Sequence, residues 1–228
     1  MININPKTAI FFDLDDTLFC EHDYVRSGFH AVADYLQKID NQLDSSTLYE
    51  YMLEDWVKNG RGKIFNHLIE EFSVPVEPMN LVQVYREHTP QLSLYSDTDR
   101  VVKLLVEKDI PRGLITDGEK GVQWRKIEAL GLKQRFPYII VTDELGKDCW
   151  KPSAVPFERA KDLLRGEVQS FIYIGDNPHK DFFTAKKMGF HTIRIIRKTG
   201  DHMLTRLSPE YEADEMIESL DELTVNLD

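Results

Sequence analysis

Five short apolar runs constrain the fold of this 228-residue chain more than any other feature of its sequence. Each run is nearly continuous, which is typical of strands that are covered on both faces. Segments with helical periodicity alternate with them. Because strands that alternate with helices form mainly parallel sheets, we expect an α/β fold with a doubly wound, Rossmann-like sheet. The runs are Ala9–Phe12, Gly113–Ile115, Tyr138–Val141, Phe171–Ile174 and His191–Ile196, and the helices are about Asp97–Lys108, Gly121–Leu130, Pro156–Leu164 and Asp181–Met188.

Residues suited to helix ends support these boundaries. Asp97 stands where its carboxylate can cap the first of these helices. Gly131 and Gly189 each follow an expected helix, at the position where a helix C-terminus needs a left-handed residue. We therefore expect Asp97 to be an N-cap and both glycines to end helices.

The segment from about residue 21 to residue 90 has helical periodicity and no strand-like run, as the spacing of Val25 and Phe29 illustrates. We therefore predict two domains. Residues 1–20 and 91–228 form the α/β core, and residues 21–90 form a small helical domain inserted after the first strand.

Two acids separated by one residue, Asp13 and Asp15, follow the first apolar run. At the end of an extended strand, residues i and i+2 point the same way, so both carboxylates can face one small volume. Two carboxylates held this close oppose each other's ionisation unless a cation or a shared proton relieves them. An isolated Asp-x-Asp is most often a pair of surface acids, but this pair after a buried strand favours a metal or acid–base chemistry.

Three further motifs follow in order, and right-handed crossovers between parallel strands would bring them to one edge of the sheet. With the first acid pair, the set resembles the haloacid dehalogenase (HAD) superfamily, in its phosphatase branch with a helical cap. The resemblance extends from about Lys7 to about Ile196. The three motifs are Thr116-Asp117-Gly118, Lys151-Pro152 and Gly175-Asp176 with Asp181.

The resemblance implies phosphoryl transfer through a phosphorylated aspartate. Asp13 would be the nucleophile and would form an aspartyl phosphate, which splits one difficult hydrolysis into two steps. Asp15 would protonate the leaving group and then accept a proton from the attacking water. Thr116 would bind phosphoryl oxygens, and Lys151 would supply a fixed positive charge beside Asp13.

The resemblance also implies a magnesium ion, because its expected ligands are all hard oxygens. They are a carboxylate of Asp13, the backbone carbonyl of Asp15 and a carboxylate of Asp176. Asp181 is expected either to meet the metal or to orient its ligands, and Asp176 ranks above it as the direct ligand. His179 and Lys180 lie between these two acids, where a solvated loop tip is the expectation.

The inserted helical segment resembles a cap that closes over the site, selects the substrate and excludes water. Residues 58–63 of this segment include two glycines and three basic residues. A plain inter-helical loop is one interpretation. The other is that Arg61 or Lys63 binds a polar or anionic part of the substrate, and Asp117 in the core is a further candidate for substrate binding.

Within the superfamily, Asp15 argues against a dehalogenase, because members that displace halide lack an acid at this position. Phosphonate-cleaving relatives need an additional lysine near the start of the cap, and no convincing candidate follows Thr17. The expected activity is hydrolysis of a small phosphate monoester, either a sugar phosphate or a nucleoside monophosphate. A sugar phosphomutase and a catalytically silent binding or interaction protein stay open as alternatives.

Composition limits the partners. A net charge of −11 disfavours binding to nucleic acid or to anionic membranes. No apolar stretch approaches the roughly 20 residues that span a bilayer, and the N-terminus does not resemble a secretory signal. Two cysteines, Cys20 and Cys149, are too few for a disulfide framework and suit a reducing compartment. We expect a cytoplasmic protein that binds a small phosphorylated metabolite, and the sequence predicts no oligomeric state.

Overall fold

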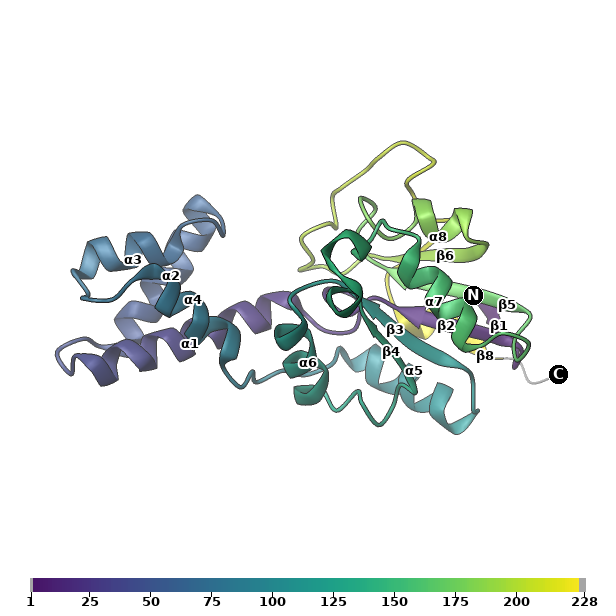
Figure 1. The fold of residues 1–228 in the computed structure, drawn as a ribbon, viewed down its shortest axis with the longest axis horizontal. Helices are drawn as coiled ribbons and strands as arrows, with labels where there is room; N and C mark the ends of the chain where they lie inside the picture. Colours follow the sequence, from purple (N-terminus) through teal and green to yellow (C-terminus); the bar gives the residue numbers. More distant parts are fainter. Residues whose placement is uncertain (1, 226–228) are drawn as a thin grey trace. The chain divides into compact units, whose positions relative to one another are not determined.

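The computed structural model describes residues 2–225 of the chain, and Figure 1 shows them as a ribbon. The chain divides into two compact units. The first contains residues 1–21 and 93–228, and the second contains residues 22–92. Each unit has its own elements and its own apolar core.

The first unit is built on a six-stranded sheet in which every pair of neighbouring strands is parallel. The strand order is β4-β3-β2-β5-β6-β7. A separate parallel pair joins β1 (Ile2–Ile4) to β8 (Leu223–Val225). The sheet strands are β2 (Thr8–Phe12), β3 (Arg112–Thr116), β4 (Tyr138–Val141), β5 (Ser170–Gly175), β6 (Phe190–Ile195) and β7 (Glu215–Ile217).

Helices cover both faces of this sheet. From β2 the chain adds β3 and β4 on one side and then returns to add β5 and β6 on the other. Right-handed crossovers in opposite directions put the first two connecting helices on one face and the next two on the other, as Figure 1 shows. The predicted doubly wound α/β fold is therefore confirmed. The helices are α5 (Ser96–Glu107), α6 (Lys120–Ala129), α7 (Val155–Leu163) and α8 (Phe183–Lys187).

The central strand β2 is buried along its whole length, which explains its continuous apolar sequence. Phe11 of this strand packs with apolar residues from β3, β5 and α7. Three short 3₁₀ segments complete the unit: η1 (Thr142–Leu145), η2 (Lys147–Cys149) and η3 (Leu220–Glu222). The strand order reverses beside β2, and ligands of open α/β sheets bind at the carboxyl ends of strands at such a point.

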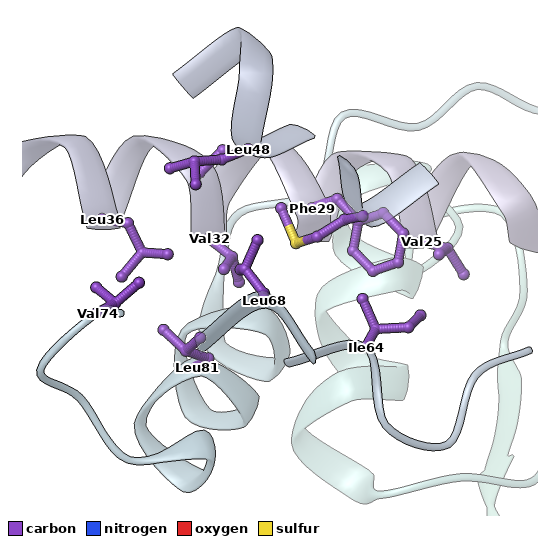
Figure 2. Close-up of a cluster of buried hydrophobic side chains, with 11 residues drawn as sticks. Val25, Phe29, Val32, Leu36, Leu48, Ile64, Leu68, Val74 and Leu81 are labelled. Atoms are coloured by element: carbon purple, nitrogen blue, oxygen red, sulfur yellow. The ribbon is translucent and has the colours of Figure 1, made fainter. Parts of the chain in front are cut away.

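The second unit consists of helices. They are α1 (Glu21–Ile39, with Glu21 in the first unit), α2 (Ser45–Asn59), α3 (Ile64–Phe72) and α4 (Pro78–Glu87). Figure 2 shows their apolar side chains converging on one cluster, to which α1 contributes Val25, Phe29, Val32 and Leu36. This spacing of three or four residues is the stripe that the sequence indicated.

The structure corrects one predicted helix end. Asp97 is not an N-cap, because α5 begins after Tyr95, and Asp97 lies inside its first turn. Its carboxylate is used in a tertiary contact, since it accepts hydrogen bonds from Arg197 and from the backbone N–H of Leu220. The two predicted glycine ends are confirmed, with left-handed φ values of 63° at Gly131 and 82° at Gly189.

Within residues 2–225, no helix combines the length and the apolar character needed to cross a membrane.

Candidate active site

The predicted motif residues of the core meet at the carboxyl ends of β2, β3 and β5, which are adjacent in the sheet. Asp13 follows β2, and its backbone N–H donates to the carbonyl of Ile174 in β5 at 2.8 Å. Thr116 is the last residue of β3, and Asp176 follows β5. A hollow of about 330 Å³ opens here; among its lining residues are Asp13, Asp15, Asp117, Lys151, Asp176 and Lys180.

Asp13 is a buried carboxylate with one engaged oxygen and one oxygen without a hydrogen bond. Its Oδ1 accepts from Lys151 Nζ at 2.8 Å, whereas Oδ2 has no hydrogen-bond partner and lies 3.9 Å from Lys180 Nζ. Burial raises the pKa of Asp13, but the positive charges of Lys151 and Lys180 outweigh it, so the pKa lies below its usual value. The group is therefore held ionised, as a nucleophile requires.

Lys151 joins three functional groups although its side chain has no exposed surface. Its Nζ lies 2.8 Å from Asp13 Oδ1, 2.8 Å from Asp181 Oδ1 and 2.7 Å from the hydroxyl of Tyr173. Burial lowers the pKa of Lys151, and the charges of Asp13 and Asp181 more than reverse this, so the pKa is raised. The lysine is thus a fixed cation at the centre of the site.

Asp13, Asp176 and Asp181 form a compact acidic group, in which one carboxylate oxygen of each lies within 4.8 Å of the others. Burial, followed by the negative charges of Asp181 and Asp13, raises the pKa of Asp176 well above its ordinary value. A bound cation would relieve this repulsion. The donors are all carboxylate oxygens, and one of them, Asp13 Oδ2, is buried without a hydrogen-bond partner, so the site fits Mg²⁺.

Asp181 differs from Asp176 because both of its oxygens already have partners. Oδ1 accepts from Lys151 and, at 3.2 Å, from the hydroxyl of Tyr173, and Oδ2 accepts from the backbone N–H of Asn177 at 2.9 Å. Gly175 leaves room for this carboxylate, since a Cβ there would lie 2.5 Å from Asp181 Oδ2. These contacts favour an orienting role for Asp181 and a direct ligand role for Asp176.

Asp15 is bonded from α6 by two side chains that sequence reasoning missed. Lys126 Nζ lies 2.7 Å from Asp15 Oδ1, and Gln123 Nε2 donates to Asp15 Oδ2 at 2.9 Å. Burial raises the pKa of Asp15, and although Lys126 counteracts this, the pKa stays raised. A carboxyl group that gains a proton more readily than usual suits a general acid.

Thr116 and Asp117 of the second motif both accept hydrogen bonds from other residues of the core. Thr116 is fully buried, and its Oγ1 accepts from Gln123 Nε2 at 2.6 Å. Asp117 Oδ1 accepts from the Thr142 hydroxyl at 2.7 Å and from the Lys151 backbone N–H at 3.1 Å. Asp117 therefore connects the ends of β3 and β4 to the loop that carries Lys151.

Lys180 is not the solvated loop tip that the sequence suggested. Its side chain is 25% exposed, and Nζ lies 3.5 Å from Asp117 Oδ2 as well as near Asp13. The acidic surroundings explain the difference, since the negative charges of Asp13, Asp181 and Asp117 raise the pKa of Lys180 against the opposing effect of burial. Asp13 thus has two ammonium groups nearby, Lys151 and Lys180, rather than one.

The two substrate candidates of the loop, Arg61 and Lys63, belong to the second unit. They line a hollow of about 280 Å³ within that unit, together with Arg86 and apolar residues that include Phe29 and Tyr85. Their role toward a substrate stays a prediction.

Sequence reasoning missed Gln123, Lys126 and Tyr173. A weak signal existed for the first two, because they lie three residues apart on the helix that follows Thr116, and such residues share a helix face. Tyr173 lies in the apolar run of β5, where an aromatic residue is ordinary core. Its contact with Lys151 depends on strand pairing and could not be read from the run itself.

Comparison with known proteins agrees with this fold. A sequence profile of haloacid dehalogenase-like hydrolases matches residues 10–195. A glyceraldehyde 3-phosphate phosphatase of Methanocaldococcus jannaschii is 28% identical over 94% of this chain and 94% of its own length. A phosphoglycolate phosphatase of Neisseria meningitidis is 26% identical over 98% of this chain and 95% of its own.

Solved structures show the same architecture. A HAD phosphatase from Thermococcus onnurineus superposes with a TM-score of 0.59, at 23% identity and covering 94% of this chain and 95% of that one. The HAD-hydrolase YfnB of Bacillus subtilis, solved with bound magnesium, has a TM-score of 0.64 at 18% identity, with the same coverage of 94% and 95%.

The sheet and the profile match over most of the chain define the class of protein: it is a hydrolase with a doubly wound, parallel-sheet core. It belongs to the haloacid dehalogenase-like hydrolase family, and the curated relatives named above are phosphatases.

Proposed function

We propose that this protein is a magnesium-dependent phosphatase that hydrolyses a small phosphate monoester through a phosphorylated Asp13. The observation that carries the proposal is the state of Asp13, which has one oxygen bonded to Lys151 and the other without a hydrogen-bond partner inside an acidic group. A buried carboxylate that is held ionised beside an ammonium group suits attack on phosphorus, because the cation limits repulsion by the phosphate.

The first transfer would begin with attack of an Asp13 oxygen on phosphorus. The bond from phosphorus to the leaving oxygen breaks, and that oxygen takes a proton from the carboxyl group of Asp15 and departs as the alcohol. In the second transfer, water attacks the aspartyl phosphate, its proton passes to Asp15, and the bond between Asp13 and phosphorus breaks to release phosphate. Lys151 and Lys180 would hold the phosphoryl oxygens electrostatically in both steps.

Magnesium would be held by carboxylates of Asp13 and Asp176 and by the backbone carbonyl of Asp15, with Asp181 orienting the group. When bound, the ion would neutralise charge on the phosphoryl oxygens and on the acids. Thr116 would contribute its hydroxyl or neighbouring amides to the phosphoryl group.

The substrate we propose is a small phosphorylated metabolite. The curated relatives are named for glyceraldehyde 3-phosphate and phosphoglycolate, and a 23% identical relative from Halopiger xanaduensis is a ribulose-1,5-bisphosphate 5-phosphatase. Sugar phosphates and related short phosphorylated acids are therefore placed ahead of nucleoside monophosphates. A cytoplasmic location would suit such a substrate.

We further propose that the helical unit is a cap that selects the substrate, with Arg61 and Lys63 as the binding residues. Three of the residues that line its hollow are basic and none is acidic, although this unit contains many acids. A surface of this kind suits the anionic or polar end of a metabolite.

The test is a panel of phosphate monoesters incubated with Mg²⁺ or with a chelator, in which both free phosphate and isomerised substrate are measured. We expect magnesium-dependent release of phosphate from one or more short sugar-type phosphates. Isomerised substrate without free phosphate would support a phosphomutase instead. Absence of both products from every compound would contradict the proposal.

A further inference from the structure

Two side chains of helix α6 donate hydrogen bonds to the carboxyl group of Asp15. Lys126 Nζ lies 2.7 Å from Oδ1, and Gln123 Nε2 lies 2.9 Å from Oδ2, so both oxygens have a donor. The two donors are three residues apart and share a helix face. Lys126 has 4% of its side chain exposed and Gln123 is 1% exposed, so bulk water has little access to either contact.

Gln123 also connects this contact to the end of β3. Its amide nitrogen lies 2.6 Å from Thr116 Oγ1, and a carboxamide has two N–H donors, one for each partner. The backbone at Gly118 packs against the same side chain, since a Cβ there would lie 2.9 Å from Gln123 Cδ. The position of Gln123 is therefore set from two sides, by the second motif and by Asp15.

We propose that Gln123 and Lys126 are positioning residues that fix the direction in which Asp15 delivers its proton to the leaving oxygen. This inference rests on the proposed phosphatase function. Proton transfer needs an approach of about 2.6–3.2 Å, and a short carboxyl side chain without partners would sample several rotamers. Two buried donors on one rigid helix restrict that sampling, in the acid form before the transfer and in the carboxylate form after it.

The chemistry of the leaving group separates this role from a structural one. An alkyl alcohol is a poor leaving group and must receive a proton as the phosphorus–oxygen bond breaks, whereas p-nitrophenolate departs without one. Loss of positioning at Asp15 should therefore slow transfer from an alkyl phosphate and spare transfer from an activated aryl phosphate. Benzyl phosphate and p-nitrophenyl phosphate form a suitable pair because the two are similar in size.

The experiment uses Gln123→Met and Lys126→Met, which remove the donors and keep most of the side-chain volume. The enzyme is in excess in a single turnover, so the appearance of benzyl alcohol or p-nitrophenolate reports the first transfer only. Lys120→Met is the control, since Lys120 is an exposed lysine on the same helix. Gln123→Met leaves no uncompensated charge, so it retains the fold even if Lys126→Met does not.

We expect each donor variant to slow the release of benzyl alcohol by about 10²-fold, and the release of p-nitrophenolate by no more than about threefold. The control variant should match the parent with both compounds. Equal losses with both compounds would assign the two residues a structural role and overturn the inference. Unchanged release of benzyl alcohol would also overturn it. A parent protein that releases phosphate from no compound of the monoester panel would contradict the proposed function and, with it, this inference.

Discussion

At the scale of single residues, Asp97 and Arg197 form a buried ion pair that ties three segments of the core together. Arg197 Nη1 lies 2.7 Å from Asp97 Oδ2, and Arg197 also donates to the carbonyl of Thr17. Asp97→Asn should lower the free energy of unfolding at pH 7 by about 3–5 kcal/mol, because it leaves Arg197 buried without its counter-ion. Chemical denaturation measures this change. Asp23→Asn removes an exposed partner of Arg26 and should change it by less than about 0.5 kcal/mol.

The same pair gives a pH dependence with a defined sign. Burial raises the pKa of Asp97, but the hydrogen bond from Arg197 and that from the Leu220 backbone outweigh it, so the folded-state pKa is lowered. Asp97 therefore adds stability above its unfolded pKa of about 3.9, and this contribution is lost as the pH falls through the folded value. The stability gap between parent and Asp97→Asn should narrow below about pH 4. A gap that widens on acidification would contradict this assignment.

Among single residues, the sequence could predict which ones belong to the site where they form part of a motif, as Asp13, Lys151 and Asp176 do. It could not predict Lys126 or Lys180, because an isolated lysine in a sequence is usually exposed. Their burial depends on carboxylates that lie far away along the chain. The predicted N-cap at Asp97 was wrong for the same reason. An Asp near the start of a helix is read locally as a cap, but its partner Arg197 lies 100 residues away in the sequence.

At the scale of elements, the packing of β3 between its neighbours depends on Gly113. A Cβ at this position would lie 2.3 Å from Phe11 Cε1 and 2.8 Å from the backbone carbonyl oxygen of Tyr138. Gly113→Ala should therefore lower the free energy of unfolding by about 1–3 kcal/mol through overpacking. Gly62→Ala is the control, because nothing described lies within 4 Å of its Cβ. Equal stability of the two variants would show that β2 and β4 can move apart without cost.

The positions of the strands could be predicted because the central ones are buried on both faces and read as apolar runs. The ends of the strands were harder to predict. Strand β3 begins at Arg112, a charged residue that the apolar pattern left out, yet its guanidinium is buried and donates to the carbonyls of Arg135 and Ile110. Strand β7 has no apolar run that would predict it, because two of its three residues are exposed and its pairing with β6 is a tertiary contact.

At the scale of the whole molecule, a magnesium ion should stabilise the folded protein, because the group of Asp13, Asp176 and Asp181 exists only in the fold. A ligand that binds only the native state adds about 2.7 kcal/mol at a concentration 100 times its Kd. Thermal unfolding with MgCl₂, compared with NaCl at equal ionic strength, should show a higher Tm for the parent and little change for Asp176→Asn. In chelator, the variant should be at least as stable as the parent, because burial and, after it, the negative charges of Asp181 and Asp13 raise the pKa of Asp176. The same magnesium shift in both proteins would remove Asp176 from the metal site.

Phosphate release by Asp13→Asn, measured beside the parent, tests whether Asp13 is the phosphorylated nucleophile of a magnesium-dependent phosphatase. Both proteins are assayed with the same phosphate monoesters and Mg²⁺, after circular dichroism has shown that the variant is folded. We predict that the rate of phosphate release falls by about 10⁴-fold or more, because the nucleophile is lost. Substantial release by the folded variant would contradict this role of Asp13.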